Sequence, residues 1–148
     1  MERRRKVVGL SLVAAAAMGL IAAYQTGIIK HLPEPPLPLL DADKVDASSE
    51  AYAKLSVPDG ILGLGSYAVT MGLAAMGGSN RAKKAPWIPL ALAAKVAADS
   101  VNAGKLTVDQ WTKHRAFCSY CLLSAAVTFA MVPLVLPEAR TALRQITA

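Results

Sequence analysis

Apolar residues gather in four blocks along the chain, separated by polar or charged segments. The blocks predict helical spans at about residues 7–29, 60–77, 87–104 and 116–136, with a loop over residues 30–59. About 20 apolar residues are the length that an α-helix needs to cross a bilayer. The second and third blocks are short, so they depend on flanking residues or neighbours. We therefore expect an all-α integral membrane protein, a four-transmembrane-helix bundle forming a single membrane domain.

The second block is rich in small residues, which let helices approach closely within a membrane. They are Gly63, Gly65, Gly72, Ala74 and Ala75. We expect this span to lie tightly against a neighbouring helix.

Basic residues define the expected topology. The loop over residues 30–59 holds three lysines and six acidic residues, whereas three other segments are mainly basic. With four spans these basic segments share one side, which the positive-inside rule makes cytoplasmic. Both termini would then be cytoplasmic, and the net charge of +6 reflects topology rather than nucleic-acid binding. The basic residues are Arg3, Arg4, Arg5, Lys6, Arg81, Lys83, Lys84, Arg140 and Arg144.

The first block also has features of a signal peptide: a basic start, an apolar stretch and the small residues Ala22 and Ala23. It continues to Ile29, however, which is longer than a usual signal core. We interpret it as an uncleaved first helix.

Short helices are predicted in two of the polar links. In the first, Asp46 or Ser48 can cap a helix that runs to Leu55, before Pro58 opens the second span. In the link after the third span, Thr107 can cap a helical turn that runs through Trp111.

Cys118 and Cys121 are the only cysteines in the sequence, and they lie where the fourth block begins. Two cysteines on one helical turn suit a redox-active disulfide, because thiol–disulfide exchange requires sulfurs that can approach each other. Their place at the end of a membrane helix favours electron exchange with a molecule dissolved in lipid. The alternative is that two small, apolar cysteines simply pack within the helix.

Two motifs in the expected order and spacing resemble the bacterial vitamin K epoxide reductase family. The first is SSEAYAKL at residues 48–55, followed by Val57-Pro58 and ILGLGSY at 61–67; the second is FCSYCLLSA at 117–125. The resemblance implies a bundle whose last-helix cysteines exchange electrons with a membrane quinone, ubiquinone or menaquinone. It also implies a bacterial inner membrane, with the cysteines on the periplasmic side beneath a short periplasmic helix.

Carried over to this sequence, the resemblance assigns four positions. Cys118 and Cys121 match the active pair, with Cys121 facing the quinone and Cys118 facing outward. The polar quinone contact at the start of the second helix falls near Asp59. Ala125 takes the position at which animal members have a quinone-contacting tyrosine, so that the tyrosine contact is missing here.

The sequence departs from the family in its first loop, where residues 30–59 contain no cysteine. We therefore expect a short form of the family, without the loop shuttle cysteines and without the fused thioredoxin-like domain of many bacterial members. An external thiol-redox protein would therefore have to reach Cys118 and Cys121 directly. The alternative function is a non-catalytic accessory subunit of a larger membrane complex built on this scaffold. A ligand-sized cavity beside Cys121 would favour the enzyme.

Reactive thiols need a positive environment, because the thiolate is the nucleophile. The N-terminal end of the helix supplies a partial positive charge, and His114 and Arg115 could add to it. His114, Cys118, Cys121 and the remote His31 could also be metal ligands, but structural zinc usually uses two close pairs, so we expect no metal.

Lys95 and Asp99 are two charges inside the third block, four residues apart and thus on one helix face. Charges within a membrane span are costly and often functional. They could line a proton path or a quinone pocket, pair with each other, or pair with a partner subunit.

Overall fold

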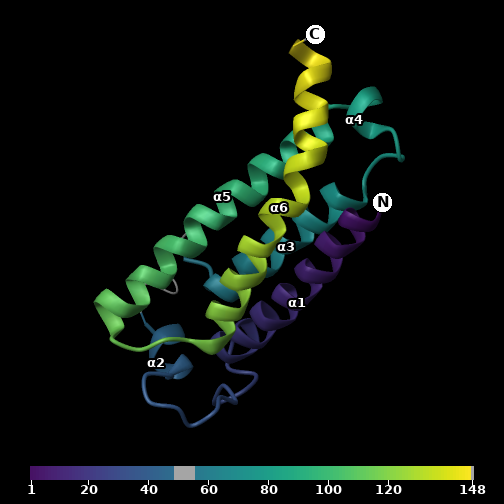
Figure 1. Cartoon of the computed structure of the whole chain (residues 1–148). Helices are drawn as coiled ribbons and strands as arrows, with labels where there is room; N and C mark the ends of the chain where they lie inside the picture. The colour runs from purple at the N-terminus through teal and green to yellow at the C-terminus, as the bar shows by residue number, and fades with distance from the viewer. Residues whose placement is uncertain (49–55, 148) are drawn as a thin grey trace.

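The computed structural model describes residues 1–48 and 56–147, and these residues are helical apart from their links. An isolated parallel bridge joins Leu40 to Phe117, and no strand forms within the described ranges. The expected all-α class is confirmed. In chain order (Figure 1), the elements are α1 (Glu2–Gln25), α2 (Ala42–Asp46), α3 (Asp59–Ala75), α4 (Arg81–Lys84), α5 (Trp87–Asp109), the π-helical turn η2 (Gln110–His114) and α6 (Ser119–Thr147).

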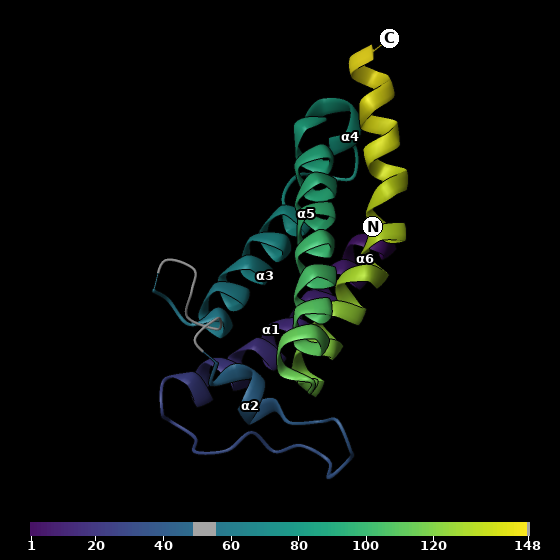
Figure 2. The same ribbon diagram turned by 90° about the vertical axis from the view of Figure 1, so that its left-hand side faces the viewer.

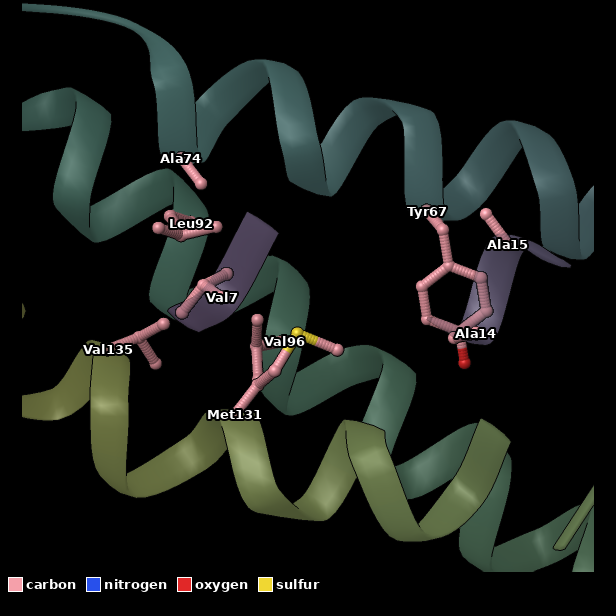
Figure 3. Close-up of a cluster of buried hydrophobic side chains, with 9 residues drawn as sticks. All are labelled: Val7, Ala14, Ala15, Tyr67, Ala74, Leu92, Val96, Met131 and Val135. Atoms are coloured by element: carbon pink, nitrogen blue, oxygen red, sulfur yellow. The ribbon is translucent and has the colours of Figure 1, made fainter. Parts of the chain in front are cut away.

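The long helices α1, α3, α5 and α6 pack side by side around a common apolar core. α1 packs against α3 and α6, and α5 packs against α6 and α3. Side chains from all of them meet in the core, where Tyr67 and Ala14 lie at one end and Val7 and Val135 at the other (Figure 3). The short helices α2 and α4 lie at opposite ends of the long helices in both views (Figures 1 and 2).

Two described helices, α1 and α6, are long and apolar enough to cross a membrane, with mean hydropathies of 2.1 and 2.0. α3 has 17 residues, and α5 contains the charged Lys95 and Asp99. Two apolar helices agree with a membrane protein.

Glycines set the ends of the first two long helices. α1 ends at Gln25 rather than Ile29, because Gly27 adopts a left-handed φ of 78° and turns the chain. α3 ends at Ala75, and Gly77 follows with a φ of 75°. A side chain is disfavoured at these positive angles, so both glycines act as helix stops.

α5 is longer than predicted. The structure continues as helix through residues 105–114, where the sequence predicted a polar link with a separate helical turn capped at Thr107. The Thr107 hydroxyl instead donates to the Ala103 carbonyl, 2.8 Å away, inside the helix. Polar residues alone do not end a helix, and this stretch contains no proline. The helix stops at Arg115, which has a left-handed φ of 51°.

α6 also differs at both ends from the predicted span at residues 116–136. It begins at Ser119, because the backbone of Phe117 is paired with Leu39 and Asp41 instead. It continues to Thr147, past two internal prolines. Each proline removes only one backbone donor, and Glu138 in the extension is anchored by Arg81.

The predicted helix from Asp46 to Leu55 lies mainly outside the described residues. The short helix that the structure describes there, α2, ends at Asp46 instead of beginning at it. Its cap is Asp41, whose side chain accepts a hydrogen bond from the Lys44 N–H at 2.9 Å.

The close approach expected of the second span occurs between α1 and α3. A Cβ added at Gly60 would lie 2.5 Å from the Ala22 nitrogen, and one at Gly63 would lie 2.5 Å from the Met18 sulfur. Gly65 has open space instead. Glycine is therefore required at Gly60, which the sequence had not indicated, because the obstacle there is backbone; at Gly63, which it had, the Met18 side chain would have to shift.

Candidate functional site

The two cysteines lie at the start of α6. Cys118 immediately precedes the helix and Cys121 is in its first turn. The Cys121 N–H points at the Cys118 sulfur, 3.3 Å away, so this sulfur takes the place of a capping oxygen. Both cysteines are free thiols. The predicted position of the pair at a helix N-terminus is thus confirmed.

Asp46, the last residue of α2, is the charged group nearest to the sulfurs among the described contacts. One of its carboxylate oxygens and both sulfurs all lie within 4.8 Å of one another. The Cys121 thiol donates to Asp46 Oδ1 at 3.8 Å. Burial raises the pKa of Asp46 to about 6, against the lowering effect of hydrogen bonds with the two thiols.

A second feature of Asp46 is an unused acceptor. Its side chain is 4% exposed, and its Oδ2 atom has no hydrogen-bond partner in the part of the chain that the structure describes. The backbone is held in place, because the Gln25 side-chain amide donates to the Asp46 carbonyl at 3.3 Å. A buried carboxyl with a free oxygen is costly unless it has a task or a ligand.

The segment over residues 30–48, which we call the cover segment, lies across the start of α6. Glu34 links the two, because its carboxylate accepts from the Ser119 N–H at 2.6 Å and from the Ala42 N–H at 2.7 Å. The Tyr120 hydroxyl donates to the Pro33 carbonyl. The cover segment is therefore fastened to the helix turn that carries the cysteines.

Cys118 is fully buried beneath this cover, with 0% of its surface exposed. It packs with Leu32, Ala42 and Val45 of the cover segment and with Ala116. Our expectation that Cys118 is the outward-facing cysteine is therefore wrong for this conformation. The motif could not reveal this, because the cover comes from residues more than 70 positions earlier in the sequence.

A partly open pocket of about 250 Å³ lies beside Cys121, lined by residues of α1, α2, α3, α5, η2 and α6. Most of its lining is apolar, and Cys121 forms part of its wall, whereas Cys118 does not. Asp59 and Ala125, the predicted quinone contacts, both line it. Further lining residues include Met18, Ile21, Val45, Asp46, Gly63, Tyr67, Leu106, Gln110 and Ser124.

Lys95 and Asp99 pair with each other, as one of our interpretations held. The Lys95 ammonium donates to Asp99 Oδ2 and, at 2.6 Å, to the hydroxyl of Ser66 on α3. Ser66 in turn donates to Asp99 Oδ1 at 3.2 Å. The pair is satisfied within the chain, and Asp99 also lines the pocket.

The two residues considered for thiolate tuning lie in different places. His114 lines the pocket. Arg115 is exposed, with its guanidinium 5.3 Å from the centroid of the Trp111 ring. The pocket lining therefore contains only one of the two candidate cations, and the group that contacts the sulfurs is acidic.

No metal is assigned to the site. Among the described residues, Asp46, Cys118 and Cys121 offer three possible ligand atoms that lie within 4.8 Å of one another, whereas a structural zinc site uses four. His31 instead contacts Asp43 on the exposed side of the cover segment, at 2.9 Å.

Sequence reasoning missed Asp46, Glu34 and Gln110 as parts of the site. The Gln110 side-chain oxygen accepts from the Cys118 N–H at 2.9 Å and so fixes the turn before α6. Each of these residues lies in a link with no periodic pattern. The available signal was the acidic character of the first loop, which we used only for topology.

Comparison with known proteins gives one family. Residues 6–136, most of the chain, match the model of a family described as the Vitamin K epoxide reductase family. No curated protein and no solved structure gives a significant match.

Proposed function

The chain belongs to the vitamin K epoxide reductase family, and from that premise we propose that it is a quinone-linked thiol–disulfide oxidoreductase. Its membership supports a membrane location and quinone-linked redox chemistry. The free pair Cys118–Cys121 supplies the thiols that this chemistry requires. Electrons would pass between this pair and a membrane quinone, ubiquinone or menaquinone.

The observation that carries the proposal is the pocket against Cys121. A cavity of about 150 Å³ accommodates a benzene ring, so the 250 Å³ here is enough for a substituted quinone ring. The lining is mainly apolar with a few polar groups, the character typical of small-molecule sites. A scaffold that had lost its function would not require such a space next to its cysteine.

Each residue of the site has a role in this proposal. A bound quinone would accept two electrons and two protons. Cys121 faces the pocket and transfers electrons, and Cys118, next to it, completes the disulfide. Asp59, in the first turn of α3, provides a carboxylate that can accept a hydrogen bond from a ring hydroxyl of the quinol, while Ala125 leaves room for the ring.

Electrons would enter or leave through a partner. Because residues 30–59 contain no cysteine, no loop disulfide of this chain can relay them. An external thiol-redox protein, or a subunit of a larger membrane complex, must then exchange with Cys118. Since Cys118 is fully buried, the cover segment has to move for that exchange.

The proposed setting is the bacterial inner membrane, with the four long helices crossing as one membrane domain. Arg4 and α4 lie together at one end of α3, where Arg4 donates to the Ala74 and Ala75 carbonyls. α2 lies at the other end (Figure 1). This arrangement supports cytoplasmic termini and a periplasmic cover segment with the cysteine pair beneath it.

A single-turnover reaction tests the proposal. Purified protein is reduced, freed of reductant and mixed with a short-tailed ubiquinone or menaquinone analogue, and the remaining thiols are alkylated and counted by mass. We expect the wild type to lose both thiols and Cys121→Ala to keep its remaining one. No loss above the quinone-free control in the wild type would contradict the proposal and favour the non-catalytic subunit.

A further inference from the structure

We propose that Asp46 is a catalytic residue of this site: its carboxylate takes the proton that Cys121 releases when the pair is oxidised. The inference rests on the proposed quinone-linked function and adds an acid–base group to it. A thiol must lose its proton to donate electrons efficiently, and a positioned carboxylate can accept that proton.

The geometry places Asp46 where a base is needed. Its Oδ1 atom already accepts the hydrogen bond of the Cys121 thiol at 3.8 Å, and both sulfurs and a carboxylate oxygen fall within 4.8 Å. Asp46 and Cys121 also line the same pocket. The carboxylate therefore reaches both the sulfurs and the space that would hold the electron acceptor.

The position of the carboxylate is set by its helix rather than by chance. Asp41 caps α2, and Gln25 holds the Asp46 carbonyl while its own side-chain oxygen accepts from the Gly60 N–H at 2.9 Å. α1, α2 and α3 are thus tied together around Asp46. A group built this rigidly into a site suits proton transfer, which depends on short, fixed distances.

The second carboxylate oxygen of Asp46, Oδ2, can carry the proton that the Cys121 thiol releases. It is buried and has no partner among the described residues, so a carboxyl proton there would displace no existing bond. The pKa of Asp46, about 6, leaves the group ionised at neutral pH but able to hold a proton briefly.

The charged and titratable groups around Asp46 are mostly acidic. Cys118 and Cys121 face it from α6, Asp59 from α3 and Glu34 from the cover segment, and the last two raise its pKa by their negative charges. Asp99, Asp109 and His114 line the same pocket from α5 and η2. Such surroundings disfavour a free thiolate and make a proton acceptor more useful.

Oxidation breaks the two S–H bonds and forms one S–S bond, releasing two electrons and two protons. Asp46 takes the Cys121 proton as this sulfur gives up electrons, and passes it to an oxygen of the quinone. The carboxylate, free again, takes the Cys118 proton as the disulfide closes and passes it to the other quinone oxygen. The quinone receives both electrons and both protons and leaves as the quinol.

The test is the pH dependence of single-turnover oxidation. Wild type, Asp46→Asn, Asp46→Glu and the control Asp43→Asn are each oxidised by the quinone analogue and, separately, by 2,2′-dipyridyl disulfide. Asp43 is a matched control, because it belongs to α2 but contacts His31 and Leu32 rather than the sulfurs.

With Asp46 as the base, the wild-type rate rises to about pH 6 and is then level up to roughly pH 8.5. Asp46→Asn loses the level region, and its rate rises about tenfold per pH unit over that range, because oxidation then depends on free thiolate. Asp46→Glu keeps the level region, and so does Asp43→Asn. Should Asp46→Asn fail to fold, a wild-type rate that climbs tenfold per unit would by itself overturn the inference.

The two oxidants separate this inference from the proposed function. The wild type could be inert to the quinone and still show the level pH profile with dipyridyl disulfide. That result refutes the quinone reaction and supports Asp46 as the proton acceptor. If the quinone oxidises wild type and Asp46→Asn with the same level pH profile, Asp46 is not the proton acceptor. The proposed quinone-linked function then still holds.

Discussion

At the scale of single residues, the two cysteines are neighbours in different surroundings. Cys118 is enclosed by apolar side chains of the cover segment, whereas Cys121 opens onto the pocket beside Asp46. The same pair can therefore meet two kinds of reactant, one from the pocket and one from outside. Access to Cys118 depends on contacts made by Glu34, Tyr120 and Phe117.

This difference predicts unequal labelling of the two thiols. In the reduced protein we expect N-ethylmaleimide to modify Cys121 several times faster than Cys118, because only Cys121 lines an open space. Glu34→Ala removes the two hydrogen bonds that fasten the cover segment and should raise the Cys118 rate about tenfold, for a loss on the order of 1–2 kcal/mol. Peptide mass mapping at short times measures both rates. Equal rates in the wild type would contradict the described burial.

The ionisation of Asp46 predicts how stability depends on pH. Its pKa is raised from 3.8 to about 6, so the folded protein binds this proton more tightly than the unfolded chain. The contribution is fully present below pH 4 and is lost as the pH rises through 6, by an amount on the order of 1–3 kcal/mol. Asp46→Asn should therefore melt higher than the wild type at pH 8 in detergent. A lower melting temperature for Asp46→Asn than for the wild type at that pH would contradict the prediction that ionised Asp46 destabilises the fold.

At the scale of elements, the site depends on how closely α1 and α3 approach. Their contact at Gly60 brings Gln25 within reach of both the α3 N-terminus and α2, and so positions Asp46. Gly60 has room for no side chain, because the obstacle is the backbone of Ala22.

A pair of glycine substitutions tests this contact. Gly60→Ala places a Cβ 2.5 Å from the Ala22 nitrogen, so the helices must separate, at a cost of about 1–3 kcal/mol. Gly65→Ala places a Cβ in open space of the same helix and should be neutral or slightly stabilising. Thermal unfolding in detergent, followed by circular dichroism, compares the two. If Gly60→Ala and Gly65→Ala melt at the same temperature, the close contact of α1 with α3 at Gly60 does not stabilise the fold.

Much of this element structure could be predicted from the sequence. Blocks of apolar residues located the four long helices, and the motif around Cys118 placed the pair at a helix start. The helix ends were less predictable: α5 continues beyond residue 104 to Asp109, and α6 continues past Pro137. The α5 extension lacks a helix-breaking residue, and the α6 extension is anchored by the pair of Glu138 with Arg81, which leaves no periodic signal in the sequence.

The pocket, too, could be predicted from the sequence only in part. Asp59, Ala125 and Cys121 lie in recognisable motifs, and the structure brings them to one cavity. Asp46 and Glu34 come from an irregular link, so only the folded chain reveals that they meet the cysteines. The motif could not show the burial of Cys118 either, since it depends on a segment distant in sequence.

At the scale of the whole molecule, a buried ion pair closes one end of the helices and the redox pair occupies the other. The Arg81 side chain is 0% exposed, and it binds both carboxylate oxygens of Glu138 at 2.7 Å. It also donates to carbonyls at the end of α3, as does Arg4. Arg81 therefore joins α3, α4 and α6 at this end of the bundle.

Breaking this ion pair should destabilise the whole bundle. Glu138→Ala leaves the buried Arg81 without its counter-ion, and we expect a loss of about 3 kcal/mol. Glu2→Ala breaks an exposed pair with Lys6 and should cause no resolvable change. Denaturant titration in detergent measures both variants, and equal effects would mean that burial does not strengthen the Arg81 pair.

The proposed function requires that the pocket beside Cys121 delivers a quinone to the thiol pair. The most direct measurement compares quinone-dependent thiol loss in wild type, Ala125→Leu and Ala126→Leu. Ala125 is buried and lines the pocket, so leucine fills space that the ring needs, whereas the adjacent Ala126 is exposed. We predict at least a tenfold slower loss for Ala125→Leu, equivalent to about 1.4 kcal/mol, and a wild-type rate for Ala126→Leu. A wild-type rate in a folded Ala125→Leu protein would contradict the proposed function.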